Sequence, residues 1–523
     1  MRRNLVAVLI GVCASLAAVQ GMASDPALIA HGESIYFGTH PSIARPGAAL
    51  VQGAPIPASA AACVACHRRS GLGSSESKLL VPPVAGSLLF NPLLPQTGRR
   101  LPWTSQDRTR PSYDEATLLR ALNEGVAPDG VPLAAPMPRY ALDRSDVAAL
   151  AAYLRTLSSA TAPGVSAEEI VFATVTTPDV PASQVEDLLN TLQEFFKERN
   201  AGTRREAGRR SQSVRTESTM YSRFRRWRLE HWALEGEPHT WSAQLEARYR
   251  ATPVFALLSG ISYDDWGPVH AFCEAARVPC LLPNAWMPPA REDFYSIYFS
   301  PGLLAEVNAV AQALAGVREV VVWTEESASG ERQRSAIVSA LGAHGIGVVM
   351  RKPRADDMVI AALPSAQVEA RYRALAHPPR RVYVLAGVLA ELPDSWTPED
   401  AGLRLRTVLV TPLGYGAKSQ QQLARTRAWL DRRKMQPGSE KLASNALLAA
   451  VLTVETLTHI DARFSREYCI EKIEHNLENI PPLTAYPRLS IGPSQRFAAK
   501  AVYLQPLVDR ADAPDFRAVS MRD

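Results

Sequence analysis

The pentapeptide Cys63–His67, Cys-Val-Ala-Cys-His, constrains this chain more than any other stretch of it. Two cysteines separated by two residues and followed directly by histidine form the attachment pattern of c-type haem. One helical turn apart, the two thiols can add to the two vinyl groups on one edge of a haem, and the next residue then presents its imidazole to the iron. A Cys-x-x-Cys pair alone would leave zinc, a redox disulfide and haem open. The adjoining histidine favours one covalently attached haem c, with His67 as axial ligand, over a redox or metal-binding pair beside a chance histidine.

Met137 is the candidate for the second axial ligand of the haem iron. It is the only methionine between the N-terminal segment and Met220, and it stands between Pro136 and Pro138. A thioether is a soft, neutral ligand, and His/Met ligation raises the reduction potential of haem. The two prolines restrict the loop that carries the sulfur. The alternative is that Met137 fills a gap in a core.

The first 23 residues have the three parts of a secretory signal peptide. Arg2 and Arg3 form a basic start, residues 5–19 are apolar, and Ala23 ends a small-x-small cleavage site. We therefore predict export, and in a bacterium a periplasmic location, which is where haem is attached to such motifs. The apolar stretch is short for a membrane span, although an uncleaved N-terminal anchor stays open. After cleavage we expect no membrane span.

The length of 523 residues predicts more than one domain. Residues 24–160 are expected to form a small all-α domain and residues 165–510 an α/β domain, followed by a tail at 511–523. The composition, with 46% hydrophobic and 21% charged residues, is ordinary for globular proteins. A formal charge of +5 is small for this length and predicts no nucleic-acid partner.

Helices are predicted in the first domain at residues 25–37, 113–125 and 146–157. Gly32 is costly inside a helix, which predicts a close crossing with another helix. The apolar, proline-rich residues 80–86 are expected to be non-helical. Ligating histidines usually donate their second N–H to a carbonyl or carboxylate, so the carbonyl of Pro82 or Pro83 is a candidate partner for His67. The alternative is a plain loop that covers the haem edge.

Residues 24–160 resemble a class I cytochrome c domain. The resemblance rests on stretches that occur in the order of that family: Gly32 and Tyr36, Cys63–His67, residues 81–86, Asp129–Leu133, Met137–Tyr140 and Leu150–Leu154. It implies that the first and last helices pack against each other beside the haem. The proline-rich residues 38–62 form a longer loop than the resemblance leads us to expect. Arg99, Arg100 and Trp103 are candidates for contacts to the haem propionates, with a solvated loop as the alternative.

Strands and helices alternate after residue 165, which predicts a parallel sheet with helices on both faces. The expected strands are residues 170–175, 253–258, 278–282, 319–323, 358–363, 381–386 and 407–410. The expected helices are residues 183–199, 265–276, 303–315, 332–344 and 366–376. Sheets of this kind bind ligands at the carboxyl ends of their strands.

Most of residues 165–510 resembles type I periplasmic binding proteins of the branched-chain amino-acid class. The resemblance rests on Thr252–Gly260, on Val278–Pro283 and on Tyr486–Arg496. It implies two lobes joined by crossing strands, with a small ligand in the cleft between them.

Four residues are candidates for the cleft: Ser262, Tyr263, Trp286 and Tyr298. The alternative for each is a packing or helix-capping role. The loop expected at residues 259–266 carries Asp264 and Asp265 beside aromatic residues, where amino-acid binders of this class have small hydroxyl residues. Two aspartates would repel a carboxylate, so we expect a neutral, cationic or aromatic ligand, a closed cleft or a docking surface.

Two further features leave alternatives open. Cys273 and Cys280 are close in sequence and would form a disulfide in an oxidising compartment, or they are two small core residues. Arg199–Arg228 is rich in arginine and aromatic residues. It is interpreted as a solvated strand pair or as a docking face for an acidic redox partner.

These observations predict an electron carrier rather than an enzyme. The partner suggested by resemblance is a quinoprotein dehydrogenase or a terminal oxidase in the periplasm. The main alternative is a solute-binding component of a transport or sensing system with an accessory cytochrome. A haem peroxidase would need an open or displaceable iron site and usually a second haem, but the sequence has one attachment motif.

Overall fold

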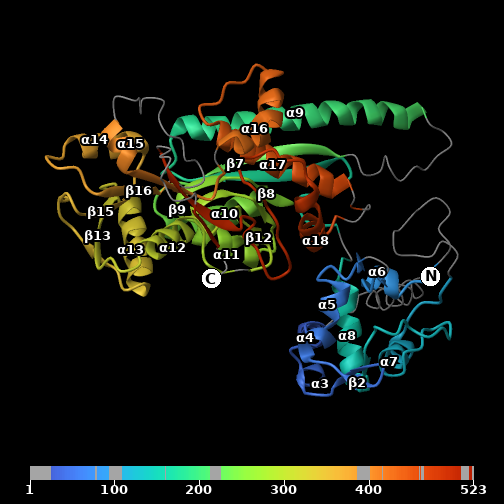
Figure 1. Cartoon of the computed structure of the whole chain (residues 1–523). Helices are drawn as coiled ribbons and strands as arrows, with labels where there is room; N and C mark the ends of the chain where they lie inside the picture. The colour runs from blue at the N-terminus through green and yellow to red at the C-terminus, as the bar shows by residue number, and fades with distance from the viewer. Residues whose placement is uncertain are drawn as a thin grey trace, which may run out of the picture. The chain divides into compact units, whose positions relative to one another are not determined.

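The computed structural model divides the chain into two compact units, Met1–Ala160 and Thr161–Asp523 (Figure 1). The structure describes residues 25–76, 79–93, 109–158, 161–212, 225–291, 293–385, 401–414, 416–458, 460, 464–507 and 517–520. The predicted signal peptide and the propionate candidates Arg99, Arg100 and Trp103 lie outside the described residues. Among the described helices, none combines the length and the apolar character that a membrane crossing requires.

The first unit is mainly helical. Its longer helices are α2 (Pro26–Tyr36), α7 (Glu115–Asn123) and α8 (Arg144–Thr156), close to the predicted ranges. Its short elements are α3 (Pro41–Ala44), β1 (Ala49–Val51), β2 (Ala54–Pro55), α4 (Ala58–Ala61), α5 (Cys63–His67), β3 (Ser74–Glu76), β4 (Leu79–Val81), α6 (Gly86–Leu89) and β5 (Arg139–Tyr140). An aspartate caps each long helix: the side chains of Asp25, Asp114 and Asp143 accept backbone N–H groups of the first turn.

The first and last helices of this unit, α2 and α8, cross each other, and Gly32 lies at the crossing. A Cβ atom on Gly32 would lie 2.0 Å from the carbonyl oxygen of Ala149, so only glycine allows this approach. The ring centroids of Tyr36 and Tyr153 lie 5.4 Å apart beside the crossing. The predicted close crossing at Gly32 is confirmed.

The prediction of a plain loop at residues 38–62 is wrong. The segment contains α3, β1, β2 and α4, and β1 pairs antiparallel with both β2 and β5. These elements are two to four residues long, too short for a hydrophobic periodicity to be visible in the sequence. The pairing with β5 ties the segment before the Cys-x-x-Cys-His motif to the strand that follows Met137.

The second unit holds two sheets with helices packed on them. The first sheet has the order β11-β9-β6-β8-β10-β12, with β7 also paired to β6, and its pairs are parallel. Its strands are β6 (Glu169–Thr176), β7 (Arg226–Ala233), β8 (Ala256–Leu258), β9 (Ile261–Asp265), β10 (Cys280–Leu281), β11 (Asn284–Met287) and β12 (Ser296–Ile297). Three buried side chains in the middle of β6, Phe172, Ala173 and Val175, are completely enclosed.

The second sheet has the order β14-β13-β15-β16-β17-β18-β19. Its strands are β13 (Glu319–Thr324), β14 (Gly347–Val349), β15 (Met358–Ala362), β16 (Arg381–Leu385), β17 (Thr407–Thr411), β18 (Ala501–Pro506) and β19 (Arg517–Ser520). The pairs from β14 to β17 are parallel, as predicted, but β18 and β19 join antiparallel. No strand was predicted after residue 410, so this antiparallel edge was not expected from the sequence.

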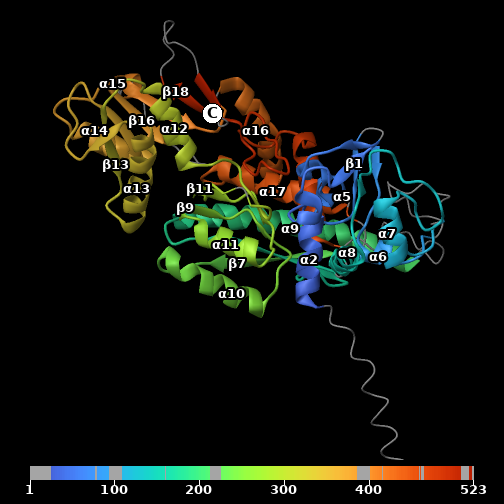
Figure 2. The ribbon, with the colours of Figure 1, turned by 90° about the horizontal axis from the view of Figure 1, so that it is seen from below.

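Helices flank both sheets in Figures 1 and 2. They are α9 (Ala182–Gln212), α10 (Trp241–Ala251), α11 (Gly267–Ala275), α12 (Leu303–Ala313), α13 (Ala328–Ala343), α14 (Ser365–Arg373), α15 (Ala401–Arg406), α16 (Gly416–Asp431), α17 (Glu440–Thr458) and α18 (Arg466–Asn476), with 3₁₀ turns at Pro238–Thr240 and Leu477–Asn479. Each predicted helix exists, and each predicted strand range contains a strand. The expected α/β class of this unit is confirmed.

In its described part, the arginine-rich stretch is a helix followed by a strand and not a strand pair. Helix α9 continues to Gln212, and β7 begins at Arg226, while residues 213–224 lie outside the described residues. Arg199 lies on α9 with its guanidinium over the ring of Trp227, and its Nη1 donates to the carbonyl of Arg225 at 2.8 Å. The part of the predicted tail that the structure describes, Arg517–Ser520, is strand β19.

Candidate functional site

The motif Cys63–His67 forms the short helix α5, so the two cysteines and the histidine lie on one turn. The turn ends at Arg68, which has a left-handed φ of 65°. The carbonyl of Arg68 accepts a hydrogen bond of 2.6 Å from the hydroxyl of Tyr36, which anchors the end of α5 to α2.

His67 is held in one orientation. Its Nδ1 lies 2.9 Å from the carbonyl oxygen of Pro82, so Nδ1 carries the proton and Nε2 keeps a free lone pair. The predicted partner of His67 is therefore confirmed. The His67 side chain is buried, and burial lowers its pKa despite the opposing effect of the Pro82 carbonyl. A neutral imidazole with a free Nε2 is the form that binds a metal ion.

A cavity of about 410 Å³ adjoins this turn in the first unit. Cys63, Cys66, His67 and Met137 all line it. The rest of the lining is mostly apolar and includes Leu80, Val81, Leu118, Leu122, Leu150 and Leu154. The sequence therefore brings the two thiols, the imidazole and the thioether to the walls of one apolar cavity.

Met137 is half-buried, and hydrogen bonds hold its backbone in place. Its N–H donates to the carbonyl of Ala134 at 3.0 Å, and its own carbonyl accepts from Nη1 of Arg139 at 2.6 Å. Tyr140, which follows Arg139, donates its hydroxyl to the carbonyl of Ala61 at 2.7 Å. These bonds fix the Met137 loop to the segment directly before Cys63.

The donor set and the cavity fit a haem c. Two thiols on one helical turn, a neutral imidazole and a thioether are the groups that covalent attachment and axial ligation require. Arg110 also lines the cavity, and its Nη2 donates to the carbonyl of Leu88 at 3.1 Å. Sequence reasoning missed Arg110, because a single arginine beside Pro111 carries no pattern.

A second cavity, of about 640 Å³, lies in the second unit. Asp179 follows the end of β6, Glu325 follows β13, and Leu385 ends β16. Tyr263 and Trp286 line it from β9 and β11. It therefore lies at the carboxyl ends of parallel strands from both sheets, where ligands of such folds bind.

Two of the four residues predicted for the cleft line this cavity and two do not. The rings of Tyr263 and Trp286 meet edge to face at 6.3 Å. The range predicted as a loop, 259–266, contains strand β9 instead. Ser262 on this strand is fully buried, and its hydroxyl donates to the Asp264 carbonyl at 3.3 Å. Tyr298 is also buried, and its hydroxyl lies 2.8 Å from Nδ1 of His270.

Carboxylates dominate the charged lining of the second cavity. Asp264 is paired with Arg332, whose Nε donates to Oδ1 at 2.7 Å, and Arg332 also bonds Glu237 at 2.8 Å. Asp179 accepts from the backbone N–H of Tyr263 at 2.6 Å through Oδ2. Its Oδ1 is buried and has no hydrogen-bond partner among the described residues. Burial raises the pKa of Asp179 above its ordinary value.

Cys273 on α11 and Cys280 on β10 are both fully buried free thiols. Burial, together with a contact to Cys280, raises the pKa of the Cys273 thiol. The structure thus describes the pair as small residues of the core of the first sheet, where they pack with Trp266 and Val278.

Residues 52–158 match the family model described as cytochrome c. The chain is also similar to a possible leucine/isoleucine/valine-binding protein from Rhodopirellula baltica, with 14% identity, a TM-score of 0.46, and coverage of 68% of this chain and 97% of that one. A fatty acid transporter substrate-binding protein from Thermomonospora curvata has 14% identity, a TM-score of 0.48, and coverage of 66% and 90%. A branched-chain amino-acid transporter protein from Thermus thermophilus with bound valine has 13% identity, a TM-score of 0.46, and coverage of 68% and 96%. A search of curated proteins found no match.

The family model confirms the resemblance of the first unit to cytochrome c. Two of these solved structures are named for branched-chain amino acids and the third for fatty acids. The fold class is confirmed: a small helical cytochrome c domain precedes a larger α/β domain with parallel sheets.

Proposed function

We propose that this chain is an exported, periplasmic electron carrier with one haem c. Cys63 and Cys66 hold the haem covalently, and His67 and Met137 are its axial ligands. The observation that supports this proposal is that these four side chains line one apolar cavity. The electrons pass between this domain and a periplasmic dehydrogenase or a terminal oxidase.

The residues around the cavity have distinct roles in this function. A haem c supplies a reversible one-electron couple at its iron. The Pro82 carbonyl holds the Nδ1 proton of His67, which keeps Nε2 as the ligating atom. Arg139 fixes the backbone of Met137 through its carbonyl. The apolar walls exclude water, which disfavours the more highly charged oxidised state and so raises the reduction potential.

An electron carrier is favoured over a peroxidase because both axial positions have a candidate ligand in this chain. A peroxidase needs one open or displaceable position for its substrate. Met137 lines the same cavity as His67, and its backbone N–H and its backbone carbonyl both form hydrogen bonds. We therefore propose no catalytic residue.

Redox titration of the purified full-length protein tests this function. We expect one covalently bound haem per chain by the pyridine haemochrome assay, and a single reversible transition that fits one electron. Irreversible reduction of the haem would contradict the electron-carrier function. Rapid catalytic consumption of hydrogen peroxide by the protein would contradict it as well.

The second unit supports a solute-binding role, which we propose as a sensing or docking function attached to the carrier. The cavity at the strand ends offers two aromatic rings, Tyr263 and Trp286, and the carboxylate of Asp179. Asp264 and Glu237 are paired with Arg332, and Glu325 accepts from Nε2 of Gln367 at 2.7 Å. Asp179, whose Oδ1 has no partner among the described residues, is therefore the carboxylate that would meet a ligand. We propose a small ligand with an amine or another hydrogen-bond donor next to an apolar or aromatic group. A solute-binding component with an accessory cytochrome remains the alternative function.

Thermal unfolding in the presence of small molecules tests this cavity. We expect an amine that binds to stabilise the second unit by about 2.7 kcal/mol at a concentration of 100 times Kd. Asp179→Asn should remove most of this stabilisation, because the ligand loses its ionic partner. Asp356→Asn, on an exposed residue, is the matched control. Equal stabilisation of wild type and Asp179→Asn, or hits confined to carboxylic acids, would contradict the proposed ligand class.

A further inference from the structure

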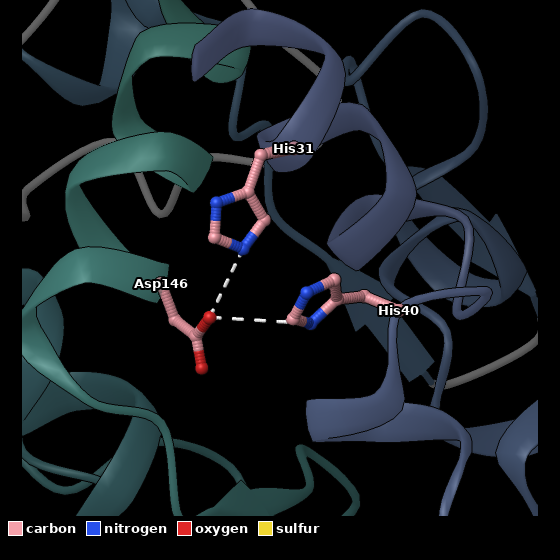
Figure 3. A group of neighbouring side chains, drawn as sticks. All are labelled: His31, His40 and Asp146. Atoms are coloured by element: carbon pink, nitrogen blue, oxygen red, sulfur yellow. Dashed lines mark hydrogen bonds and ion pairs between the residues drawn. The ribbon is translucent and has the colours of Figure 1, made fainter. Parts of the chain in front are cut away.

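Three side chains outside the haem cavity converge on one point of the first unit (Figure 3). His31 lies on α2, His40 directly precedes α3, and Asp146 lies in the first turn of α8. Nε2 of His31 is 3.1 Å from Oδ1 of Asp146, and Nδ1 of His40 is 3.9 Å from the same oxygen. One potential ligand atom from each residue lies within 4.8 Å of the other two.

A simple ion pair between His31 and Asp146 does not account for His40. The ring centroids of the two histidines are only 4.4 Å apart, so two imidazolium ions here would repel each other. Nδ1 of His40 accepts the backbone N–H of Ser42 at 3.3 Å and lies 3.1 Å from the Ser42 hydroxyl oxygen, so its lone pair faces Ser42 and not a proton of its own ring. A cation bound to this lone pair would replace the contact to Ser42 and would also neutralise the carboxylate of Asp146.

The cluster is rigid on one side and accessible on the other. The Asp146 side chain is 8% exposed, whereas those of His31 and His40 are 31% and 28% exposed. Helix α2 is fixed to α8 by the close crossing at Gly32, adjacent to His31. The carboxylate therefore has a defined position, while an ion from solvent can reach both imidazoles.

We propose that His31, His40 and Asp146 bind a divalent transition-metal ion such as Zn²⁺, with one coordination position left for water or an external ligand. Two imidazoles and a carboxylate suit zinc, whereas Ca²⁺ and Mg²⁺ prefer oxygen ligands. Ligands about 2.0–2.1 Å from a tetrahedral ion lie about 3.3 Å from one another. The separations of 3.1 Å and 3.9 Å lie on either side of that value, and all three ligand atoms lie within 4.8 Å of one another, so side-chain rotations that draw them together complete the site.

The site joins three segments of the first unit. α2 and α8 form the helix crossing, and α3 begins the segment that leads to the Cys-x-x-Cys-His motif. Bound metal would fasten that segment to the crossing. This role is independent of electron transfer, because none of the three residues lines the haem cavity.

Zinc titration of the full-length, haem-loaded protein tests the proposal. We expect calorimetry to show one Zn²⁺ per chain, and X-ray absorption at the zinc edge, which is separate from that of haem iron, to show two imidazoles. His31→Gln and His40→Asn should each weaken binding at least roughly tenfold. Asn at position 40 can still cap α3, so this variant separates metal binding from helix capping. His239→Ala, on an exposed residue of the second unit, is the matched control and should bind like wild type.

Each variant is compared only if it retains the haem absorption spectrum and circular dichroism of the wild type. A chelator should lower the unfolding temperature of the zinc-loaded wild type and leave that of Asp146→Asn unchanged. Zinc binding that is equally strong in His31→Gln and His40→Asn, or that His239→Ala removes, would overturn the proposal. So would the absence of stoichiometric binding by the wild type, because the cluster would then be an ion pair alone.

Discussion

Replacing both Cys63 and Cys66 by serine is expected to abolish covalent haem attachment completely. The two thiols lie on one turn of α5 and line the same cavity as His67. Serine keeps the size and the helix but cannot form the thioether bonds to the haem edge. The measurement is haem staining of the denatured protein after electrophoresis, together with the intact mass.

The same double variant should also lose much of the stability of the first unit. A cavity of about 410 Å³ with apolar walls would then lack a covalently fixed group to pack against. The control is Cys273→Ser with Cys280→Ser, which removes two thiols of the second unit's core and should leave haem attachment unchanged. Covalent haem in the Cys63/Cys66 variant would contradict the assignment of the motif.

The second large effect is expected for Met137→Ala. Loss of the thioether leaves the iron with His67 as its only strong axial ligand from the described residues, so the oxidised haem should become high-spin. The weak absorption band at the red end of the spectrum that reports iron–sulfur ligation should disappear. The reduction potential should fall by on the order of 0.1–0.2 V, within the range of about 0.8 V that axial ligands span.

The matched control for this variant is Met350→Ala, which removes the thioether of an exposed methionine in the second unit. It should keep the red band and the wild-type potential. An unchanged spectrum and potential in Met137→Ala would show that another group fills the sixth position, and it would remove Met137 from the proposed ligands.

Features that depend on neighbouring residues could be predicted from the sequence. The spacing within Cys63–His67 predicts covalent haem attachment. The proline-rich stretch near Pro82 suggested the hydrogen bond to His67 that the structure contains. Gly32 predicted the close crossing because glycine inside a helix is costly unless another backbone approaches. The alternation of strands and helices likewise predicted the second unit.

Features that depend on distant residues could not be predicted. Asp264 meets Arg332 across 68 positions, so its apparent availability to a ligand was misleading. Ser262 and Tyr298 are near cleft residues in the sequence, but both are buried and do not line the cavity. Which side chains are buried depends on how the strands pair in the sheet, and spacing along the chain does not give this pairing. The cluster of His31, His40 and Asp146 was missed because α8 supplies the third ligand 106 residues after His40.

The spin state of the oxidised wild-type haem tests the central claim most directly. Electron paramagnetic resonance at low temperature, together with the absorption spectrum, distinguishes a six-coordinate low-spin iron from a five-coordinate high-spin iron. The proposed His67/Met137 ligation predicts a low-spin signal with the red sulfur-to-iron band. A high-spin signal in the wild type would contradict the electron-carrier function and would leave a haem with an open position.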